Sequence, residues 1–134
     1  MLEKRIVQAA RKGMLVEITD SVREIVAASG VRSGVAVVST PDVDAGVLIT
    51  SFYDPKGHED IIDDFVRIWP ARDNFHFEGE VAEGAAHSKS SIAGQSVDFI
   101  VEDGELKLGG SQGTFFAEYA APRAREYRVA VFGA

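Results

Sequence analysis

The alternation of apolar and polar residues predicts strands at both ends of the chain. Weak alternation over residues 2–9 and an apolar run over residues 15–19, on either side of Lys12-Gly13, predict a hairpin. Patterns of period two return near the end of the chain and are interrupted by a turn at Asp103-Gly104. They predict four more strands, at residues 96–101, 105–108, 113–119 and 126–132.

Apolar residues at helical spacing predict two long helices. Ser21 followed by Glu24 matches a capping box, and Gly30 is placed where that helix should end. Asp54-Pro55 offers a carboxylate at an N-cap and a proline at the first helical position. The second helix is expected to bury a wide stripe formed by Ile61, Ile62, Phe65, Val66, Ile68 and Trp69.

The remaining segments complete the predicted architecture. Apolar, β-branched runs at residues 34–38 and 45–52 predict central strands joined by a polar loop. Residues 72–83 are polar and irregular, whereas small residues over 84–93 predict a short helix packed closely against another element. Two long helices and one short helix on a large mixed or antiparallel sheet make an α+β fold. Without a linker or repeat, residues 1–134 are expected to form a single domain.

Composition and charge narrow the classes of function. The chain has 14 Lys and Arg against 21 Asp and Glu, a net charge of −7, and no cysteine. An acidic surface repels nucleic acid and anionic lipid, so neither is an expected partner. The lack of cysteine excludes disulfides, thiolate metal sites and cysteine nucleophiles. No apolar stretch is typical of an export signal or a membrane span, so a cytoplasmic location is expected.

Three histidines and two aspartates are the first candidates for chemistry. His87 is either a partly buried histidine that is hydrogen-bonded to a neighbour, or a functional residue that serves as a metal ligand or as a proton donor. His76 is more simply a loop imidazole wedged between aromatic residues, and His58 is expected at the surface. Asp42 and Asp44 follow an apolar strand, where turn formation is the simpler role. Alternatively, Asp42, His76 and His87 could together hold a divalent ion with open coordination positions.

The segment Ser88 to Ser91 suggests a phosphate site. Lys89 offers an ammonium group, and Ser90 and Ser91, ahead of Gly94, offer hydroxyl and backbone N–H groups. A solvated helix face is the alternative. The chain contains no Walker loop, no Gly-x-Gly-x-x-Gly turn and no Gly-x-Ser-x-Gly elbow, so the usual nucleotide sites and nucleophilic serine are not supported.

An ordered set of short motifs covers nearly the whole chain. Its members are Asp54-Pro55, the run Ala86-His87-x-Lys89-x-Ser91-x-x-Gly94-x-Ser96, the turn Leu108-Gly109-x-x-Gln112-Gly113, Glu118 and Pro122-Arg123. In this order they resemble the YjbQ-like family, also called the secondary thiamine-phosphate synthase family. The resemblance implies an α+β fold, a homotrimer and a histidine-rich, metal-binding pocket. It also implies a weak transferase activity that joins a pyrimidine diphosphate to a thiazole phosphate and releases pyrophosphate.

Three positions depart from the family pattern. The family's His-Thr-Thr motif aligns on Asp42-Val43-Asp44, its Asn-Glu pair on Thr50-Ser51, and its tryptophan on Ser111. The resemblance therefore implies a metal site made of Asp42, His76 and His87. A carboxylate in place of an imidazole would favour manganese or magnesium over zinc.

The resemblance also implies roles for other residues. His87 and Lys89 are the expected catalytic residues, with Ser91 and Arg123 binding the phosphorylated ligand. Lys89 or Arg123 would neutralise the charge that develops on a leaving diphosphate. The expected function is thus a metal-dependent transferase of the thiamine-phosphate synthase type, or a related enzyme acting on small phosphorylated metabolites. The alternative is a non-catalytic oligomeric or small-anion-binding protein whose pocket has lost three family residues.

Overall fold

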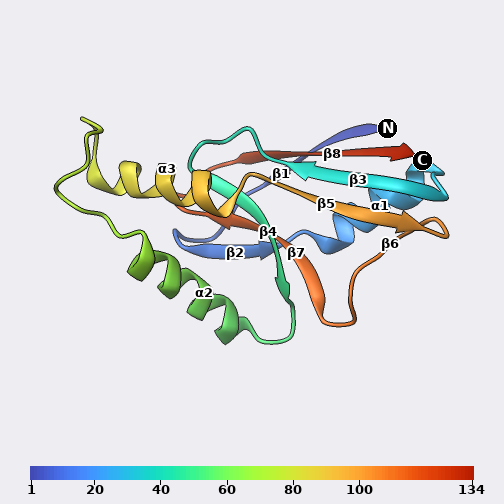
Figure 1. The fold of residues 1–134 in the computed structure, drawn as a ribbon, viewed down its shortest axis with the longest axis horizontal. Helices are drawn as coiled ribbons and strands as arrows, with labels where there is room; N and C mark the ends of the chain where they lie inside the picture. The colour runs from blue at the N-terminus through green and yellow to red at the C-terminus, as the bar shows by residue number, and fades with distance from the viewer.

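Eight strands form two antiparallel sheets, and three helices pack around them (Figure 1). The computed structural model describes residues 1–134. The strands are β1 (Leu2–Val7), β2 (Met14–Glu17), β3 (Ser33–Ser39), β4 (Ala45–Ser51), β5 (Ser96–Glu102), β6 (Glu105–Leu106), β7 (Gln112–Glu118) and β8 (Arg125–Gly133). The helices are α1 (Thr19–Ser29), α2 (Pro55–Ile68) and α3 (Val81–Ala93). None of the three is long and apolar enough to cross a membrane.

The α+β class is confirmed, but the strands divide between two sheets. The larger sheet has the order β1-β8-β3-β5-β6 and the smaller one β2-β7-β4, with every neighbouring pair antiparallel. The predicted hairpin at the N-terminus is wrong. β1 pairs with β8 and β2 pairs with β7, so the link between them crosses from one sheet to the other. Local alternation predicts strands but does not choose their partners.

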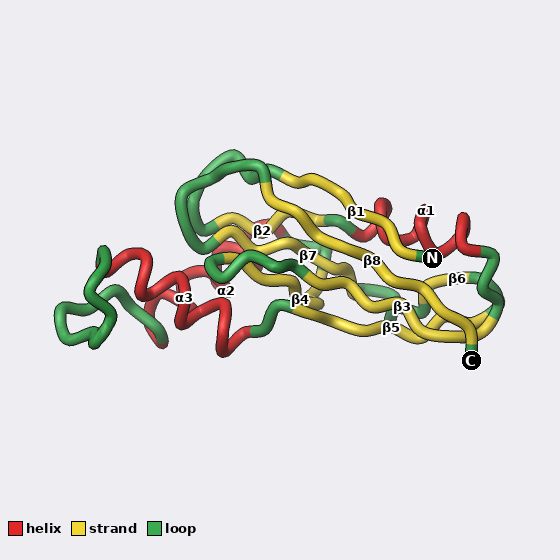
Figure 2. The backbone as a smooth tube through the Cα atoms, turned by 90° about the horizontal axis from the view of Figure 1, so that it is seen from above, coloured by secondary structure: helices red, strands yellow, loops and turns green.

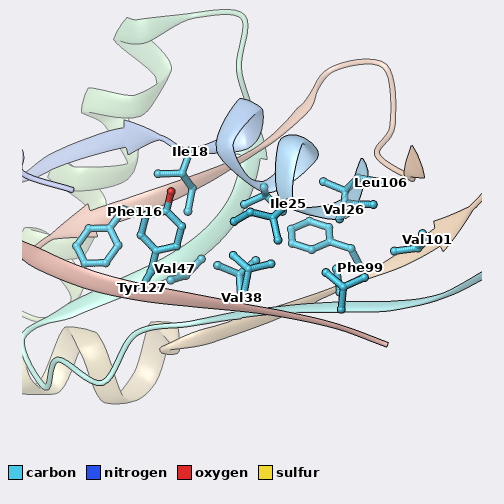
Figure 3. Packing of buried hydrophobic residues seen from close by; sticks show 14 of the residues in the cluster. Ile18, Ile25, Val26, Val38, Val47, Phe99, Val101, Leu106, Phe116 and Tyr127 are labelled. Atoms are coloured by element: carbon cyan, nitrogen blue, oxygen red, sulfur yellow. The ribbon is translucent and has the colours of Figure 1, made fainter. Parts of the chain in front are cut away.

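The main core lies between the two sheets and α1. It contains Val38 of β3, Val47 of β4 and Phe116 of β7, and α1 adds Ile25 and Val26 (Figure 3). Strand β7 is buried from Gly113 to Glu118 because both of its faces are covered. Phe116 faces the core between the sheets, whereas Phe115 belongs to a second cluster under α2 and α3. Strand β7 therefore connects the main core to the helical layer.

The helix ends follow the predicted signals only in part. Asp54 caps α2 by accepting a hydrogen bond of 2.9 Å from the N–H of Lys56, and Gly30 ends α1 with a left-handed φ of 72°, as predicted. The capping box at Ser21 is not formed, since α1 already begins at Thr19. The Thr19 hydroxyl instead donates to Glu17 and accepts from the N–H of Thr114 in β7.

The second helix is less buried than its pattern predicts. None of its residues is fully buried, and Val66 and Ile68 are 51% and 57% exposed. Ile61, Ile62 and Phe65 are half-buried against the smaller sheet. A sheet of three strands offers too narrow a face to cover the whole apolar stripe of α2. The strand predicted as central at residues 45–52 is β4, and it lies at the edge of this sheet.

The third helix begins three residues before the predicted segment. Its small residues Gly84, Ala85 and Ala86 are buried, which confirms close packing. Figure 2 shows α2 and α3 at one end of the molecule and α1 toward the other end. A second layer of helices thus covers the outer face of the smaller sheet, and a cavity lies within this layer.

Candidate functional site

A cavity of about 250 Å³ lies between α2, α3, the end of β7 and the link from β1 to β2. Its walls are largely apolar, with two lysines among them. Ligand pockets for drug-sized molecules begin at roughly 300 Å³, so the cavity suits one small metabolite. The lining residues are Lys12, Gly13, Ile62, Phe65, Val66, Lys89 and Tyr119.

The helical spacing of α3 carries Lys89 into the protein. Residues three and four positions apart share a helix face, so Lys89 follows the buried Ala85 and Ala86. The next residue, Ser90, anchors this turn by donating from its hydroxyl to the carbonyl of Ala45 at 2.6 Å. The Lys89 side chain is consequently held against the cavity, and the residue is only 7% exposed.

Lys89 has no oppositely charged partner. Burial lowers its pKa, and the positive charge of nearby Lys12 lowers it further. Lys12 is exposed, so it lies on the solvent side of the cavity. Two ammonium groups without carboxylates therefore share a mostly apolar cavity in a protein of net charge −7.

Tyr119 forms another part of the cavity wall. Alternation along the strand places Phe115, Ala117 and Tyr119 on the face that meets the helices. The Tyr119 hydroxyl is buried without a hydrogen-bond partner, and burial raises the pKa of this phenol above its ordinary value. Gly46 leaves the space for it, since a Cβ there would lie 3.2 Å from the hydroxyl oxygen.

We expect Tyr119→Phe to raise the free energy of unfolding by about 1 kcal/mol, because a buried polar group without a partner costs about that much. The same change affects alkaline stability. Since folding raises the pKa of Tyr119, the folded state loses stability as pH rises above the unfolded value of about 10. The variant is expected to lose less stability over that range. Urea unfolding at pH 7 and pH 11 measures both effects, and a variant less stable than wild type at pH 7 would show that the hydroxyl has a partner.

A buried network of charges joins the residue before β4, the end of β7 and the start of β8, and none of its side chains lines the cavity. Arg125 donates through Nε and Nη2 to both oxygens of Glu118, at 2.9 and 2.5 Å, and through Nη1 to Asp44 at 2.5 Å. The side chains of Arg125 and Glu118 are fully buried. Burial by itself would lower the pKa of Arg125, but its hydrogen bonds to Glu118 and Asp44, together with their charges, raise it.

Asp42 belongs to this network and not to a group of histidines. Its carboxylate lies 3.5 Å from Arg125 and 3.9 Å from Arg123, which also lies 3.8 Å from Asp44. No group of three or more His, Asp or Glu residues in the chain is close enough to hold a metal ion. Within one chain, Asp42, His76 and His87 therefore do not assemble, and two guanidinium groups beside Asp42 would repel a cation. Metal binding by these residues stays a prediction.

The histidines are dispersed. His76 is exposed in the loop before α3, and it is the neighbouring Phe77 that packs edge-on against half-buried His87, with ring centroids 5.2 Å apart. His58 was expected at the surface but is half-buried. Its Nε2 lies 2.6 Å from the carbonyl oxygen of Ser51, and its ring packs against Phe115.

Two other predicted residues lie outside the cavity lining. Ser91 is exposed in the last turn of α3, and its hydroxyl donates to the carbonyl of His87 at 2.8 Å. This end of a helix presents carbonyl groups, so it offers an anion no free N–H. Arg123 is 56% exposed and faces the aspartates. Of the predicted site residues, only Lys89 lines the cavity.

Sequence reasoning missed Lys12 and Tyr119. Tyr119 could have been found, because the predicted strand over residues 113–119 places it on the same face as Phe115. Lys12 could not have been found, because it lies in the link between β1 and β2. The position of this link depends on the pairing of β1 with β8 and of β2 with β7, which are far away in the sequence.

Comparisons with known proteins agree on one family. Residues 3–134 match the family model described as "UPF0047 protein YjbQ-like". The chain is 38% identical to UPF0047 protein MJ1081 of Methanocaldococcus jannaschii, covering 99% of this chain and 95% of that protein. It is 33% identical to UPF0047 protein YugU of Bacillus subtilis, covering 99% and 100%.

Solved structures share the fold. A YbjQ-like protein of unknown function from Sulfolobus solfataricus superposes with a TM-score of 0.93 at 26% identity, covering 100% of this chain and 97% of that one. An uncharacterised conserved protein of the YjbQ/UPF0047 family from Clostridium acetobutylicum gives a TM-score of 0.88 at 32% identity, covering 97% and 99%.

Proposed function

Because the chain belongs to the YjbQ-like UPF0047 family, we propose that it binds a small phosphorylated metabolite in the cavity between α2, α3 and β7. The observation that carries this proposal is the pair Lys12 and Lys89. Both line the cavity, and neither has a carboxylate partner. Ile62, Phe65 and Val66 supply an apolar wall for the rest of the ligand.

Charge balance favours phosphate over a carboxylate. A phosphate monoester carries about −1.5 to −2 charges at pH 7, which matches two ammonium groups better than one carboxylate does. Lys89 is already desolvated, so its interaction with an anion is less weakened by water than an interaction at the surface. An anionic ligand would also relieve the repulsion between Lys12 and Lys89.

A transferase of the thiamine-phosphate synthase type is the finer form of this proposal. Each of its two substrates combines a heteroaromatic ring with a phosphorylated arm, and the cavity would hold one of them between its apolar wall and the two lysines. Lys89 would then neutralise charge on the leaving diphosphate.

A non-catalytic binder of small anions is the second candidate. It is favoured by the position of Asp42, which is paired with Arg123 and Arg125 instead of two histidines. Metal analysis of protein purified without chelators separates the two candidates. A divalent ion at near one per chain supports the enzyme, and its absence supports the binder.

A homotrimer is the proposed assembly. Its support is the outer face of the larger sheet, where Leu2, Ile100 and Phe132 are all more than half exposed. The β-ladder places Val35 between Phe132 and Ile100, so the apolar residues form a continuous row. A subunit contact would remove this row from water.

Phenyl phosphate, which joins an aromatic ring to a phosphate, tests the binding proposal. We expect it to bind more tightly than inorganic phosphate because its ring becomes buried. Lys12→Gln is expected to weaken its binding about tenfold, since a hydrogen bond to a charged group contributes about 1.5 kcal/mol. Isothermal titration calorimetry measures both effects.

Lys107→Gln is the matched control, because Lys107 is also exposed but pairs with Glu102 at 4.0 Å and lines no part of the cavity. It should leave the affinity unchanged. Equal losses in the two variants, or no binding to the wild type, would contradict the proposal.

A further inference from the structure

Lys89 differs from every other lysine of the chain. Of five lysines it is the only one that is buried. It is also without an ion pair or a hydrogen bond, whereas exposed Lys107 has Glu102 as its partner. A buried cation is normally paired, so an unpaired one needs another explanation.

The amine of Lys89 is open to a ligand. The Tyr119 hydroxyl is the one buried side-chain nitrogen or oxygen in the chain that lacks a partner. The Lys89 amine has no hydrogen-bond partner either, but its nitrogen is not among the fully buried atoms. Some of the surface of this nitrogen is therefore accessible. The cavity that Lys89 lines provides the access.

The surroundings of Lys89 are those of an activated amine. Lysines become nucleophiles when they are desolvated in an apolar pocket or placed beside another cation. Both conditions hold here, and burial and the charge of Lys12 lower the pKa of Lys89 accordingly. More of the neutral amine is present at pH 7 than at an exposed lysine.

We propose that Lys89 forms an imine with an aldehyde or ketone group of the phosphorylated ligand. This inference rests on the proposed function, because the same cavity holds the ligand. The neutral amine nitrogen bonds to the carbonyl carbon, and a proton moves from nitrogen to oxygen to give a carbinolamine. Loss of water then forms the C=N bond, with no oxidant or reductant required.

The two lysines have separate roles in this reaction. Lys12, exposed at the cavity, holds the phosphate. Lys89, whose ammonium form helps to attract the anionic ligand, reacts with the carbonyl once it has lost its proton. The side chains of Ile62, Phe65 and Val66 offer an apolar wall to the rest of the ligand. The ligand class is therefore a small phosphorylated aldehyde or ketone.

Reductive trapping tests the proposal. Pyridoxal 5′-phosphate is the probe because it combines an aldehyde, an aromatic ring and a phosphate. The full chain is incubated with the probe at pH 7, reduced with borohydride to a stable secondary amine, and mapped by peptide mass spectrometry. We expect Lys89 to be labelled several-fold faster than Lys4, Lys12, Lys56 or Lys107, which serve as references in the same sample.

Variants and a competitor assign the label to the cavity. Lys89→Met should abolish the fast label, whereas Lys107→Met should leave it unchanged. Phenyl phosphate has no carbonyl and should slow labelling of the two cavity lysines, Lys12 and Lys89, while labelling of Lys4, Lys56 and Lys107 stays unchanged. The wild-type peptide map stands by itself if Lys89→Met does not fold.

The outcomes separate the two proposals. Labelling of Lys89 no faster than that of the exposed lysines overturns imine formation, even if phenyl phosphate binds and the binding proposal stands. Fast labelling by both pyridoxal and its phosphate, without any binding of phenyl phosphate, supports the reactive amine and overturns phosphate recognition. If Lys89 is labelled no faster than the exposed lysines and phenyl phosphate does not bind, both proposals are overturned.

Discussion

Arg125→Met is expected to lower the free energy of unfolding by about 3 to 5 kcal/mol, because it leaves buried carboxylates without their cation. Glu118 would lose two hydrogen bonds and Asp44 one, and the two negative charges would then repel each other. The Glu118 side chain is fully buried, so water cannot replace the guanidinium without opening the structure. Urea unfolding followed by circular dichroism measures the change.

Arg128→Met is the matched control on the same strand. Arg128 also donates to a carboxylate, that of Glu126 at 3.0 Å, but its side chain is 47% exposed. An exposed pair contributes about 0 to 1 kcal/mol, so this variant should remain near wild type. Similar losses for the two variants would show that the buried network adds no special stability.

Replacing both Arg125 and Glu118, the fully buried pair, separates the free-energy cost of leaving one charge unpaired from the net contribution of the pair to stability. Arg125→Met combined with Glu118→Leu should recover part of the stability lost by Arg125→Met alone, since hydrophobic replacements of a buried ion pair are often tolerated. A double variant as unstable as the sum of the two single variants would contradict this account.

Gly34→Ala is expected to lower the free energy of unfolding by about 3 kcal/mol, at the upper end of the usual cost of overpacking. A Cβ at Gly34 would collide with the carbonyl oxygen of Phe132 and lie 3.0 Å from the Cα of Gly133. These atoms belong to the backbone of β8, which pairs with β3 and cannot move aside as a side chain can. Urea unfolding measures the loss.

The same substitution in an open loop is the control for Gly34. A Cβ at Gly110 would meet no atom within 4 Å, and its φ lies outside the left-handed region. Gly110→Ala should therefore be neutral or stabilise by about 0.4 to 1 kcal/mol, because alanine restricts the unfolded chain. If Gly34→Ala changed the free energy of unfolding no more than Gly110→Ala does, this result would contradict the close approach of β3 and β8 at Gly34.

The candidate site shows how far residue patterns reach. Lys89 was predicted to contact a phosphate from its sequence context, and it does line a cavity. The prediction grouped Asp42 with His76 and His87, however, and Asp42 lies instead beside Arg125, 83 positions further along the chain. Neither spacing nor residue type could identify that arginine as a partner, because their proximity depends on the pairing of strands.

The sequence alone determined the local elements: the terminal strands, the start of α2 at Asp54-Pro55 and the end of α1 at Gly30. These follow from side-chain alternation and capping, which act over a few residues. Only the tertiary structure decided that the strands form two sheets, that the face of α2 is incompletely covered, and that Lys12, Lys89 and Tyr119 share a cavity. The physical reason is that strand pairing and burial depend on contacts between distant segments, which no local pattern encodes.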